Sequence, residues 1–254
     1  MNFKSFLALM AKRFPKRLAE PFDRVGLMTG QLPENVNKVL LCLDLDWELL
    51  PMVKQSKPDF IITHHPFIFG TKYQVFKKDE SKRLLCEEID KLGIPVYSFH
   101  TNFDAGVGGM NDALTNALGL KDIYTPIDNP MMRIGFLEEE MDIFSFASYA
   151  KHRLDVNYGL LIHEGHPIIG KVGIIGGGGS RDWEVAQKEG CDIYISGDVP
   201  HHVRRDIVNA QFNYLDLPHE IEKIFMPTME KYLLSIDKDL VIQSYDHERL
   251  PKII

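Results

Sequence analysis

The sequence predicts an α/β fold organised as two lobes, and two features of the chain support this prediction. Short apolar runs of strand length alternate with amphipathic segments of helix length along the 254 residues. A proline-marked stretch at residues 125–130 interrupts this alternation and separates two series of elements. We therefore expect one lobe at residues 1–125 and another at residues 126–254, or a single intertwined domain.

The first lobe is expected to follow a β-α-β-α-β order after an N-terminal helix. That helix is indicated by apolar residues at helical spacing, which are Phe3, Phe6, Leu7 and Met10. Strands are predicted at residues 39–43, 59–63 and 95–99, and helices at residues 46–54, 81–92 and 111–118. Strands joined by helical crossovers run parallel, so their carboxyl ends are expected along one edge of the sheet, where ligands of α/β folds bind.

The second lobe is expected to continue with an alternation of the same kind. Its predicted strands lie at residues 133–137, 160–163, 171–175, 192–195, 212–215 and 240–244. Its predicted helices lie at residues 144–154, 183–188 and 203–210, and a last helix is expected to begin near His219, with a bend at Pro227.

The composition is that of an ordinary soluble globular protein. The chain is 44% hydrophobic and 26% charged, and its formal net charge of -7 argues against a surface built to hold nucleic acid. No apolar stretch is long enough to span a bilayer. Cys42, Cys86 and Cys191 are isolated and odd in number, so we expect buried thiols in a reducing cytoplasm rather than disulfides or a thiolate metal site.

Histidines follow two of the predicted strands in the first lobe. His64 and His65 end the apolar run at residues 59–63, and His100 and Asp104 follow the run at residues 95–99. Adjacent strand residues point to opposite faces, so both imidazoles can serve one site only where the strand ends, or if they reach two different ions. Metal pairs in hydrolytic sites lie about 3.5–4 Å apart and usually share a bridging carboxylate, for which Asp104 is the first candidate.

The second lobe shows the same pattern at two further strand ends. Asp198, His201 and His202 follow the strand at residues 192–195. His219 and Glu222 follow the strand at residues 212–215 and share one face of a helix, whereas Glu220 points elsewhere. Imidazole nitrogen with carboxylate oxygen suits Zn, Mn, Fe, Co or Ni.

Taken singly, each of these histidines is more often a capping or surface residue than a ligand. Four strand ends that all finish in histidine with a nearby acid are hard to explain by packing, because histidine has only an intermediate preference for burial. The remaining histidines lack this setting and are expected at the surface or in loops: His152, His163, His166 and His247.

The glycine run at residues 176–179 has two explanations. It follows a predicted strand and precedes a helix, a context in which backbone N–H groups can hold a phosphate. A tight turn or a close backbone approach explains the glycines equally well. The chain has no P-loop ending, no G-x-G-x-x-G pattern with a suitably placed acid, no H-E-x-x-H helix and no G-x-S-x-G elbow.

Several segments together resemble the Nif-three-like dinuclear-metal family, whose members are often called GTP cyclohydrolase 1 type 2 homologs. The segments with the resemblance are Phe22 to Leu27, Ile62 to Pro66, His100 to Asp104, Gly108 to Asp112, the glycine run, Ser196 to Asp198 and Asp216 to His219. The resemblance covers nearly the whole chain. The chain departs from the family at Pro218, where glycine is common, and at Arg24, where asparagine often stands.

The resemblance implies a ligand set, a fold and an assembly. His64, His65, Asp104, His219 and a glutamate would hold two divalent metal ions, with Asp104 and the glutamate as bridges. We assign that glutamate to Glu222, although the spacing in relatives varies and leaves Glu220 as the alternative. The implied fold has two related α/β lobes with mostly parallel sheets and the metal site in the cleft between them. The implied assembly is a ring-shaped homohexamer.

We expect a metal-dependent hydrolase that acts on a small molecule by metal-activated water, with His100 or His202 moving protons. The resemblance makes that molecule a purine nucleotide and names hydrolytic opening of the GTP ring as the activity. The alternative is a non-catalytic metal-binding or protein-interaction and regulatory protein. A ring that clamps nucleic acid is disfavoured by the acidic composition, so neither nucleic acid nor membrane is expected as a partner.

Overall fold

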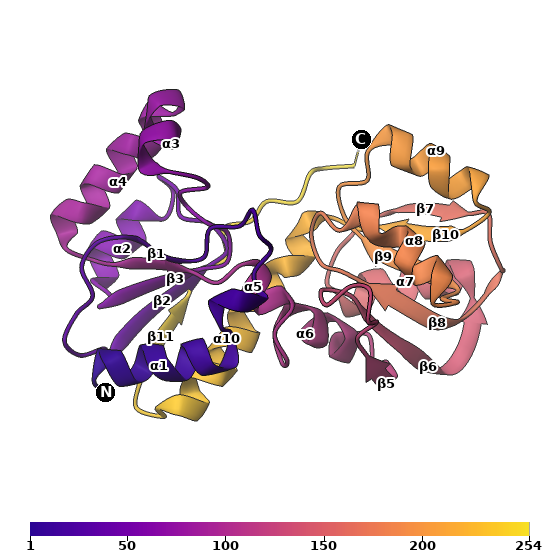
Figure 1. The fold of residues 1–254 in the computed structure, drawn as a ribbon, viewed down its shortest axis with the longest axis horizontal. Coiled ribbons are helices and arrows are strands. Elements are labelled where there is room, and N and C mark those ends of the chain that lie inside the picture. The colour runs from indigo at the N-terminus through magenta and orange to yellow at the C-terminus, as the bar shows by residue number, and fades with distance from the viewer. Residues whose placement is uncertain (254) are drawn as a thin grey trace. The chain divides into compact units, whose positions relative to one another are not determined.

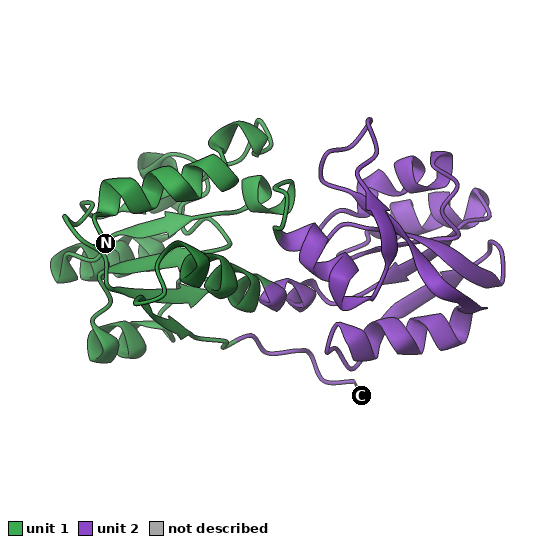
Figure 2. Ribbon diagram, turned by 90° about the horizontal axis from the view of Figure 1, so that it is seen from below, with its two compact units in different colours: residues 1–109, 225–247 green, residues 110–224, 248–254 purple. Residues whose placement is uncertain are grey.

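The computed structural model describes residues 1–253, which form a mixed α/β protein with two sheets (Figure 1). The chain divides into two compact units (Figure 2). Unit 1 comprises Met1–Gly109 and Phe225–His247, and unit 2 comprises Met110–Ile224 with the C-terminal residues from Glu248. This division differs from the expected boundary between residues 125 and 126. Residues 110–124 belong to unit 2, and the chain returns to unit 1 after Ile224. Both segments pack against elements that lie far away in the sequence.

The sheet of unit 1 has the strand order β1-β4-β3-β2-β11. Its strands are β1 (Gly26–Thr29), β2 (Lys38–Cys42), β3 (Phe60–Thr63), β4 (Val96–Ser98) and β11 (Val241–Ser244). All neighbouring pairs are parallel except β1 with β4. The expected parallel order of the strands at residues 39–43, 59–63 and 95–99 is therefore found. The terminal strand β11 joins this sheet beside β2 rather than the second one.

Helices cover both faces of this sheet (Figure 1). They are α1 (Phe3–Arg13), α2 (Leu50–Ser56), α3 (Lys72–Lys78), α4 (Glu80–Leu92), α5 (Thr101–Asp104) and α10 (Phe225–Ile236), with a 3-10 turn η1 (Lys16–Leu18). Local sequence sets their ends: the Asn2 side chain caps α1, and Gly93, with φ of 69°, ends α4. On one face Phe60 packs edge-on against Phe3, at a ring centroid distance of 4.9 Å. On the other face α2 and α4 bury Val53 and Ile89.

The sheet of unit 2 has the strand order β5-β6-β8-β9-β10-β7. Its strands are β5 (Lys121–Tyr124), β6 (Arg133–Asp142), β7 (Leu160–His163), β8 (Ile168–Ile174), β9 (Ile193–Ser196) and β10 (Asn213–Asp216). Only β8 with β9 and β9 with β10 pair in parallel, and the other pairs are antiparallel. The prediction of mostly parallel sheets is thus correct for unit 1 and wrong for unit 2. The parallel strands β8, β9 and β10 are connected in turn through α8 and α9, whereas β5 joins β6 without a helix.

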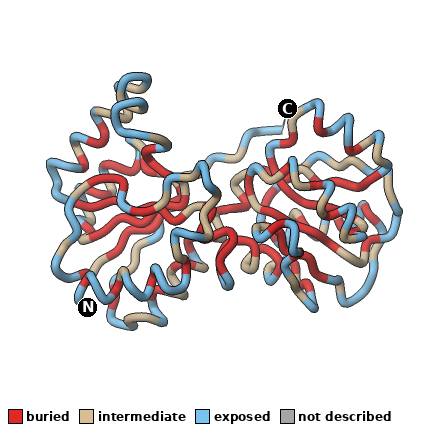
Figure 3. Tube along the Cα trace, viewed as in Figure 1, coloured by how far each residue is buried: buried red, intermediate tan, exposed pale blue. Residues whose placement is uncertain are grey.

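The helices of unit 2 also lie on both faces of its sheet. They are α6 (Met110–Ala117), α7 (Ile143–Arg153), α8 (Trp183–Lys188) and α9 (His201–Asn209), with 3-10 segments η2 (Ser180–Asp182) and η3 (His219–Ile224). Tyr194 and Tyr214, on neighbouring strands, are fully buried beneath α8 and α9. The central strands of both sheets, such as β2, β3, β9 and β10, form the buried centre of each unit (Figure 3).

The last predicted helix is divided rather than bent at Pro227. The segment that begins at His219 is the 3-10 segment η3, and the α-helix α10 begins only at Phe225. In a 3-10 helix, side chains three residues apart lie one above the other. The three cysteines are buried, and none forms a disulfide within residues 1–253. No helix within residues 1–253 combines the length and the hydrophobicity needed to cross a bilayer.

Candidate metal-binding clusters

The first cluster lies at the carboxyl edge of the unit 1 sheet. We call His64, His65, His100 and Asp104 the unit 1 cluster. Strand β3 ends at Thr63, so the two adjacent histidines lie beyond the strand, and their ring centroids are 5.0 Å apart. The ring of His100, after β4, lies 5.2 Å from that of His64. One ring nitrogen from each of the three histidines lies within 4.8 Å of the other two.

Backbone contacts hold the double histidine in place. The N–H groups of His64 and His65 both donate to the carbonyl of Leu43, in the loop after β2, at 3.1 and 3.0 Å. The Thr63 hydroxyl donates to the His65 carbonyl at 2.9 Å. The two imidazoles therefore take their positions from neighbouring parallel strands.

An oxygen acceptor faces the Nδ1 atom of every histidine in this cluster. His64 Nδ1 lies 2.8 Å from the Phe99 carbonyl, His65 Nδ1 lies 2.7 Å from Asp44 Oδ2, and His100 Nδ1 lies 2.9 Å from Asp23 Oδ2. A carbonyl or an ionised carboxylate can only accept, so Nδ1 is the donor and Nε2 is the nitrogen that would coordinate a metal. This is the usual arrangement of metal-binding histidines, in which a second hydrogen bond fixes the tautomer and the ring orientation.

Asp104 adds a carboxylate to the three imidazoles. It lies at the end of the short helix α5, it is 7% exposed, and its Oδ1 is 3.6 Å from His64 Nε2. The rings of Phe103 and Phe225 lie 6.4 and 5.1 Å from that of His64, which is fully buried. Apolar surroundings lower the local dielectric constant and strengthen the attraction of these ligands for a cation.

Asp23 and Asp44 hold the histidines but were not among the predicted site residues. Burial opposes the ionisation of Asp23, but hydrogen bonds from His100 and Thr101 outweigh it and lower the pKa of Asp23 to about 2. Burial likewise opposes ionisation of Asp44, and the hydrogen bond from His65 lowers its pKa. Asp23 lies in the segment Phe22 to Leu27 of the family resemblance, but its spacing along the chain does not reveal its contact with His100.

The second cluster lies at the carboxyl edge of the unit 2 sheet, and we call His219, Glu222 and Asp198 the unit 2 cluster. His219 begins η3 directly after β10, and its Nε2 lies 3.0 Å from Glu222 Oε2, one 3-10 turn later. Its Nδ1 lies 2.6 Å from Oδ2 of Asp198, which follows β9. The hydrogen bond with Glu222 raises the pKa of His219 to about 9 against the opposing effect of burial, and Asp198 adds to the rise. The cluster therefore favours a positive charge between His219 and Glu222.

The glycine run lies against this second cluster. Gly177 has φ of +63°, and a β-carbon there would lie 2.1 Å from Glu222 Oε1 and 3.1 Å from His219 Nε2. The Gly177 carbonyl accepts hydrogen bonds from the Gly197 N–H and the Ser196 hydroxyl, at 2.7 and 2.9 Å. Close backbone approach thus accounts for Gly177 without a bound phosphate.

Three other predicted positions lie outside the two clusters. His202 is exposed in the first turn of α9, and within residues 1–253 no hydrogen bond or ion pair joins it to His219 or Glu222. Glu220 lines a pocket beside His219 instead of contacting its Nε2. His247, expected at the surface or in a loop, lies in a loop, but its side chain is only 5% exposed, with Nε2 3.1 Å from Asp46 Oδ2. The reason is that β11 extends the first sheet beside β2, so the residues after it reach the same edge as the loop after β2.

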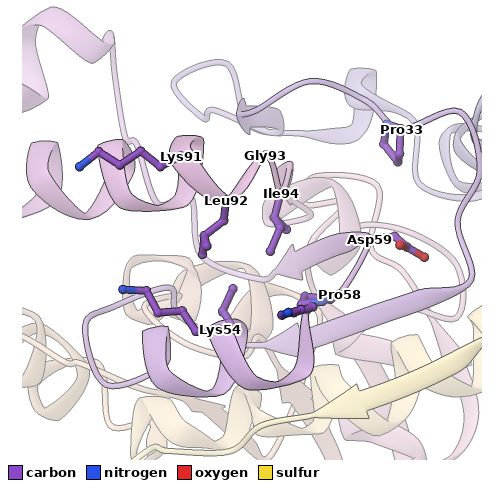
Figure 4. Close-up of a pocket in the computed structure, with 10 residues that line it drawn as sticks. Pro33, Lys54, Pro58, Asp59, Lys91, Leu92, Gly93 and Ile94 are labelled. Atoms are coloured by element: carbon purple, nitrogen blue, oxygen red, sulfur yellow. The ribbon is translucent and has the colours of Figure 1, made fainter.

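Unit 1 also has a hollow of about 500 Å³ that does not belong to its cluster (Figure 4). Asp59 and Ile94, which line it, precede β3 and β4, whereas the histidines follow these strands. The hollow therefore lies at the opposite edge of the sheet. Two of its lysines, Lys54 and Lys91, pair with Glu88 at 3.2 and 2.8 Å.

The fold and the two clusters define an α/β protein with histidine and carboxylate groups suited to divalent metals. The chain belongs to the Duf34/NIF3 (NGG1p interacting factor 3) family, whose model matches residues 1–248. The family expected from the sequence is thereby confirmed.

Two similar proteins are named GTP cyclohydrolase 1 type 2 homolog. The one from Lactococcus lactis subsp. lactis is 30% identical over 259 residues, which cover 99% of this chain and 98% of that protein. The one from Clostridium perfringens is 30% identical over 248 residues, covering 94% of each.

Two solved structures share the fold. A Bacillus cereus protein related to NIF3 matches with a TM-score of 0.87 and 22% identity, over 100% of this chain and 99% of that one. Reduced HcgD from Methanocaldococcus jannaschii matches with a TM-score of 0.81 and 23% identity, over 96% and 97% of the two chains.

Proposed function

We propose that this protein is a hydrolase that depends on two divalent metal ions. The proposed ligands are His64, His65 and Asp104 in unit 1, and His219 and Glu222 in unit 2. The observation that supports this proposal most directly is the oxygen partner on Nδ1 of His64, His65 and His219, which holds each imidazole in one orientation, as in metal-binding histidines.

The donor set fits such ions chemically. Imidazole nitrogen and carboxylate oxygen suit Zn, Mn, Fe, Co and Ni, and the three buried thiols lie outside both clusters. The carboxylates of Asp104 and Glu222 would supply the negative charge that screens two cations from one another. When bound, divalent ions supply the activation of water and the polarisation of the substrate that hydrolysis requires.

The residues of the chain then have distinct tasks. Asp44 and Asp198 orient the imidazoles of His65 and His219. We assign proton transfer to Nε2 of His100, because its Nδ1 is held by Asp23 while its ring lies within 5.8 Å of both other histidine rings. His202 has no part in this proposal.

The names of the relatives support a purine nucleotide as the substrate class, with hydrolytic opening of the GTP ring as the first reaction to assay. The test combines elemental analysis with turnover. We expect purified protein loaded with a defined metal to hold two ions per chain and to hydrolyse GTP. The Asp104→Asn variant should lose metal and at least about 100-fold in rate, whereas Asp239→Asn, at an exposed position, should match the parent protein.

Two results would count against the proposal. If the protein holds no metal under any loading condition, the proposed metal sites are wrong. Full metal content without turnover of GTP or of any phosphoester would favour the alternative, a non-catalytic metal-binding or interaction protein. Circular dichroism of Asp104→Asn separates loss of ligands from loss of fold.

We also propose that the chain assembles as a homohexamer. The exposed aromatic rings of Phe22 and Phe69, which are 66% and 50% accessible with centroids 6.5 Å apart, support a contact surface on unit 1. Sedimentation velocity tests this directly, and a monomer at micromolar concentration would contradict it.

A further inference from the structure

A pocket of about 370 Å³ opens beside His219 within unit 2, and the metal ligands do not account for it. We call it the Arg204 pocket. Its walls come from the end of β10, the first half of α9, the segment before β7 and the C-terminal segment of the chain. Its polar side chains are Tyr158, Asp198, Arg204, Asp216, His219 and Glu220. A volume of this size accommodates a small planar ligand.

Arg204 supplies the hydrogen-bond donors of this pocket. Its Nε donates to the Val199 carbonyl at 3.3 Å, which anchors the guanidinium. In the part of the chain that the structure describes, no protein group accepts a hydrogen bond from its two terminal nitrogens. A planar guanidinium with two such nitrogens is suited to bidentate recognition of neighbouring acceptors.

Asp216 supplies an acceptor in the same pocket. It ends β10, and its carboxyl group interacts electrostatically with the positive charge of Arg204 and the negative charge of Asp198. Burial raises the pKa of Asp216 to about 6, so the group is ionised at neutral pH although the protein environment opposes this. The backbone N–H of Val199 donates a hydrogen bond to this carboxyl group, and no side chain among residues 1–253 donates another. An ionised carboxylate without a side-chain donor favours a ligand that brings donors of its own.

The charge of the pocket limits the class of ligand. The three carboxylates of Asp198, Asp216 and Glu220 outnumber the two cationic groups, the guanidinium of Arg204 and the imidazole of His219, so the triphosphate of a nucleotide is disfavoured there. A neutral ligand edge with two adjacent donors and two adjacent acceptors satisfies both Asp216 and Arg204. Guanine has this edge, because N1–H and the 2-amino group donate while O6 and N7 accept, and Arg commonly binds O6 and N7 together. Adenine lacks the pair of donors.

We propose that the Arg204 pocket binds a guanine-type base, with Asp216 accepting from N1–H and the 2-amino group and Arg204 donating to O6 and N7. Tyr158, in the wall of the pocket, provides an aromatic surface for the ring. This inference rests on the proposed function, because it places the base of a purine substrate beside the His219 ligand. It goes further by naming the side chains that select the base.

Calorimetric titration of the full-length, metal-loaded protein with nucleosides tests this assignment. Nucleosides carry no phosphate, so the measurement isolates the base. Guanosine should bind at least about 10-fold more tightly than adenosine, since unpaired polar groups penalise the wrong base. Arg204→Met should weaken guanosine binding about 10-fold, whereas Arg205→Met, the neighbour on α9 outside the pocket, should leave it unchanged.

The Asp216→Asn variant tests the assignment through a change in nucleoside preference, which a purely structural role of Asp216 would not produce. The amide offers a donor in place of an acceptor, so guanosine should lose about 10-fold in affinity while xanthosine, which carries a carbonyl in place of the 2-amino group, should gain. Equal weakening of both nucleosides, or equal affinity of the parent protein for guanosine and adenosine, would overturn the inference.

Repeating the titration after chelation separates this inference from the proposed hydrolase function. Arg204 and Asp216 are not proposed metal ligands, so guanosine preference should survive removal of metal. Survival of the preference in a protein without turnover supports the pocket assignment and not the hydrolase. Metal-dependent turnover without any guanosine preference overturns the pocket assignment alone.

Discussion

The α-carbon of Gly177 lies so close to the carboxylate of Glu222 that a β-carbon there would stand 2.1 Å from Oε1. Glycine is therefore required by two independent constraints, since the residue also has φ of +63°. The loop after β8 and the 3-10 segment η3 approach each other at this point, and the position of Glu222 depends on the absence of a side chain.

Replacing Gly177 by Ala should displace Glu222 and disturb the unit 2 cluster. A left-handed backbone costs an L-residue about 1–2 kcal/mol, and the steric contact adds to this, so the free energy of unfolding should fall by about 2–4 kcal/mol. Metal content should fall as well, because Glu222 is a proposed ligand. Urea unfolding and elemental analysis measure the two effects.

Gly178→Ala is the matched control for that substitution. Gly178 lies outside the left-handed region, and the nearest atom to a β-carbon there would be Asp198 Oδ2 at 3.9 Å. Stability should change by less than about 0.5 kcal/mol and metal content should be retained. Equal losses in the two variants would show that the contact with Glu222 is not the reason for the glycine.

Asp198→Asn should weaken metal binding through His219. Asp198 Oδ2 lies 2.6 Å from His219 Nδ1, and asparagine tolerates the φ of 55° at this position, so the backbone should keep its conformation. Loss of such an outer carboxylate typically costs about 10-fold in metal affinity. The pKa of His219 in the metal-free protein should also fall from its present value of about 9.

Competition with a chelating dye gives the affinity for metal, and NMR titration gives the pKa of His219. Asp206→Asn, at an exposed position on α9, controls for the change in net charge. If both quantities stay unchanged in Asp198→Asn, the contact between Asp198 and His219 contributes nothing to metal binding.

The convergence of the candidate ligands inside each unit could be predicted from the sequence. A β-α-β-α-β order implies parallel strands, and parallel strands place their carboxyl ends together. His64, His65 and His100 accordingly meet after β3 and β4. Asp198 and His219 meet after the parallel strands β9 and β10 for the same reason.

Contacts that depend on which distant segments pair could not be predicted in this way. Strand β11 looks like any short apolar run, and nothing in its local pattern indicates β2 as its partner, so the burial of the His247 side chain was not expected. The same holds for Asp23, whose hydrogen bond with His100 joins two loops far apart in the chain. Periodicity reports which face of a strand or helix is apolar, not which partner covers it.

Asp23→Asn should lower stability in a manner that depends on pH. The pKa of Asp23 lies at about 2, below its ordinary value of 3.8, because hydrogen bonds from His100 and Thr101 outweigh the cost of burial. Its contribution is therefore fully present above pH 3.8 and is lost as the pH falls through 2. At pH 7 the variant should be less stable by about 2 kcal/mol, and the difference should shrink below about pH 4.

Urea unfolding at a series of pH values measures this difference, with Asp239→Asn as the control. A loss of stability that is the same at pH 3 and pH 7 would indicate a steric effect of the amide rather than a carboxylate held in its ionised form.

Asp216→Asn should have the opposite effect on stability to Asp23→Asn, because it should raise the free energy of unfolding of the ligand-free protein. Burial raises the pKa of Asp216 from 3.8 to about 6, so the folded state binds a proton more tightly than the unfolded chain does. Stability is therefore lost as the pH rises from 3.8 to 6, and the loss is complete above that range. After allowance for partial solvent exposure, the variant should gain about 1–2 kcal/mol at pH 7.5 and almost nothing at pH 3.5.

Such a gain would mean that the chain keeps an ionised Asp216 at a cost in stability, which is expected of a group that serves ligand binding. Urea unfolding of the parent protein and the variant at the two pH values decides the question. If the variant is no more stable than the parent at pH 7.5, Asp216 is not held against its preferred protonation state, and the argument for a ligand with two donors loses its electrostatic support.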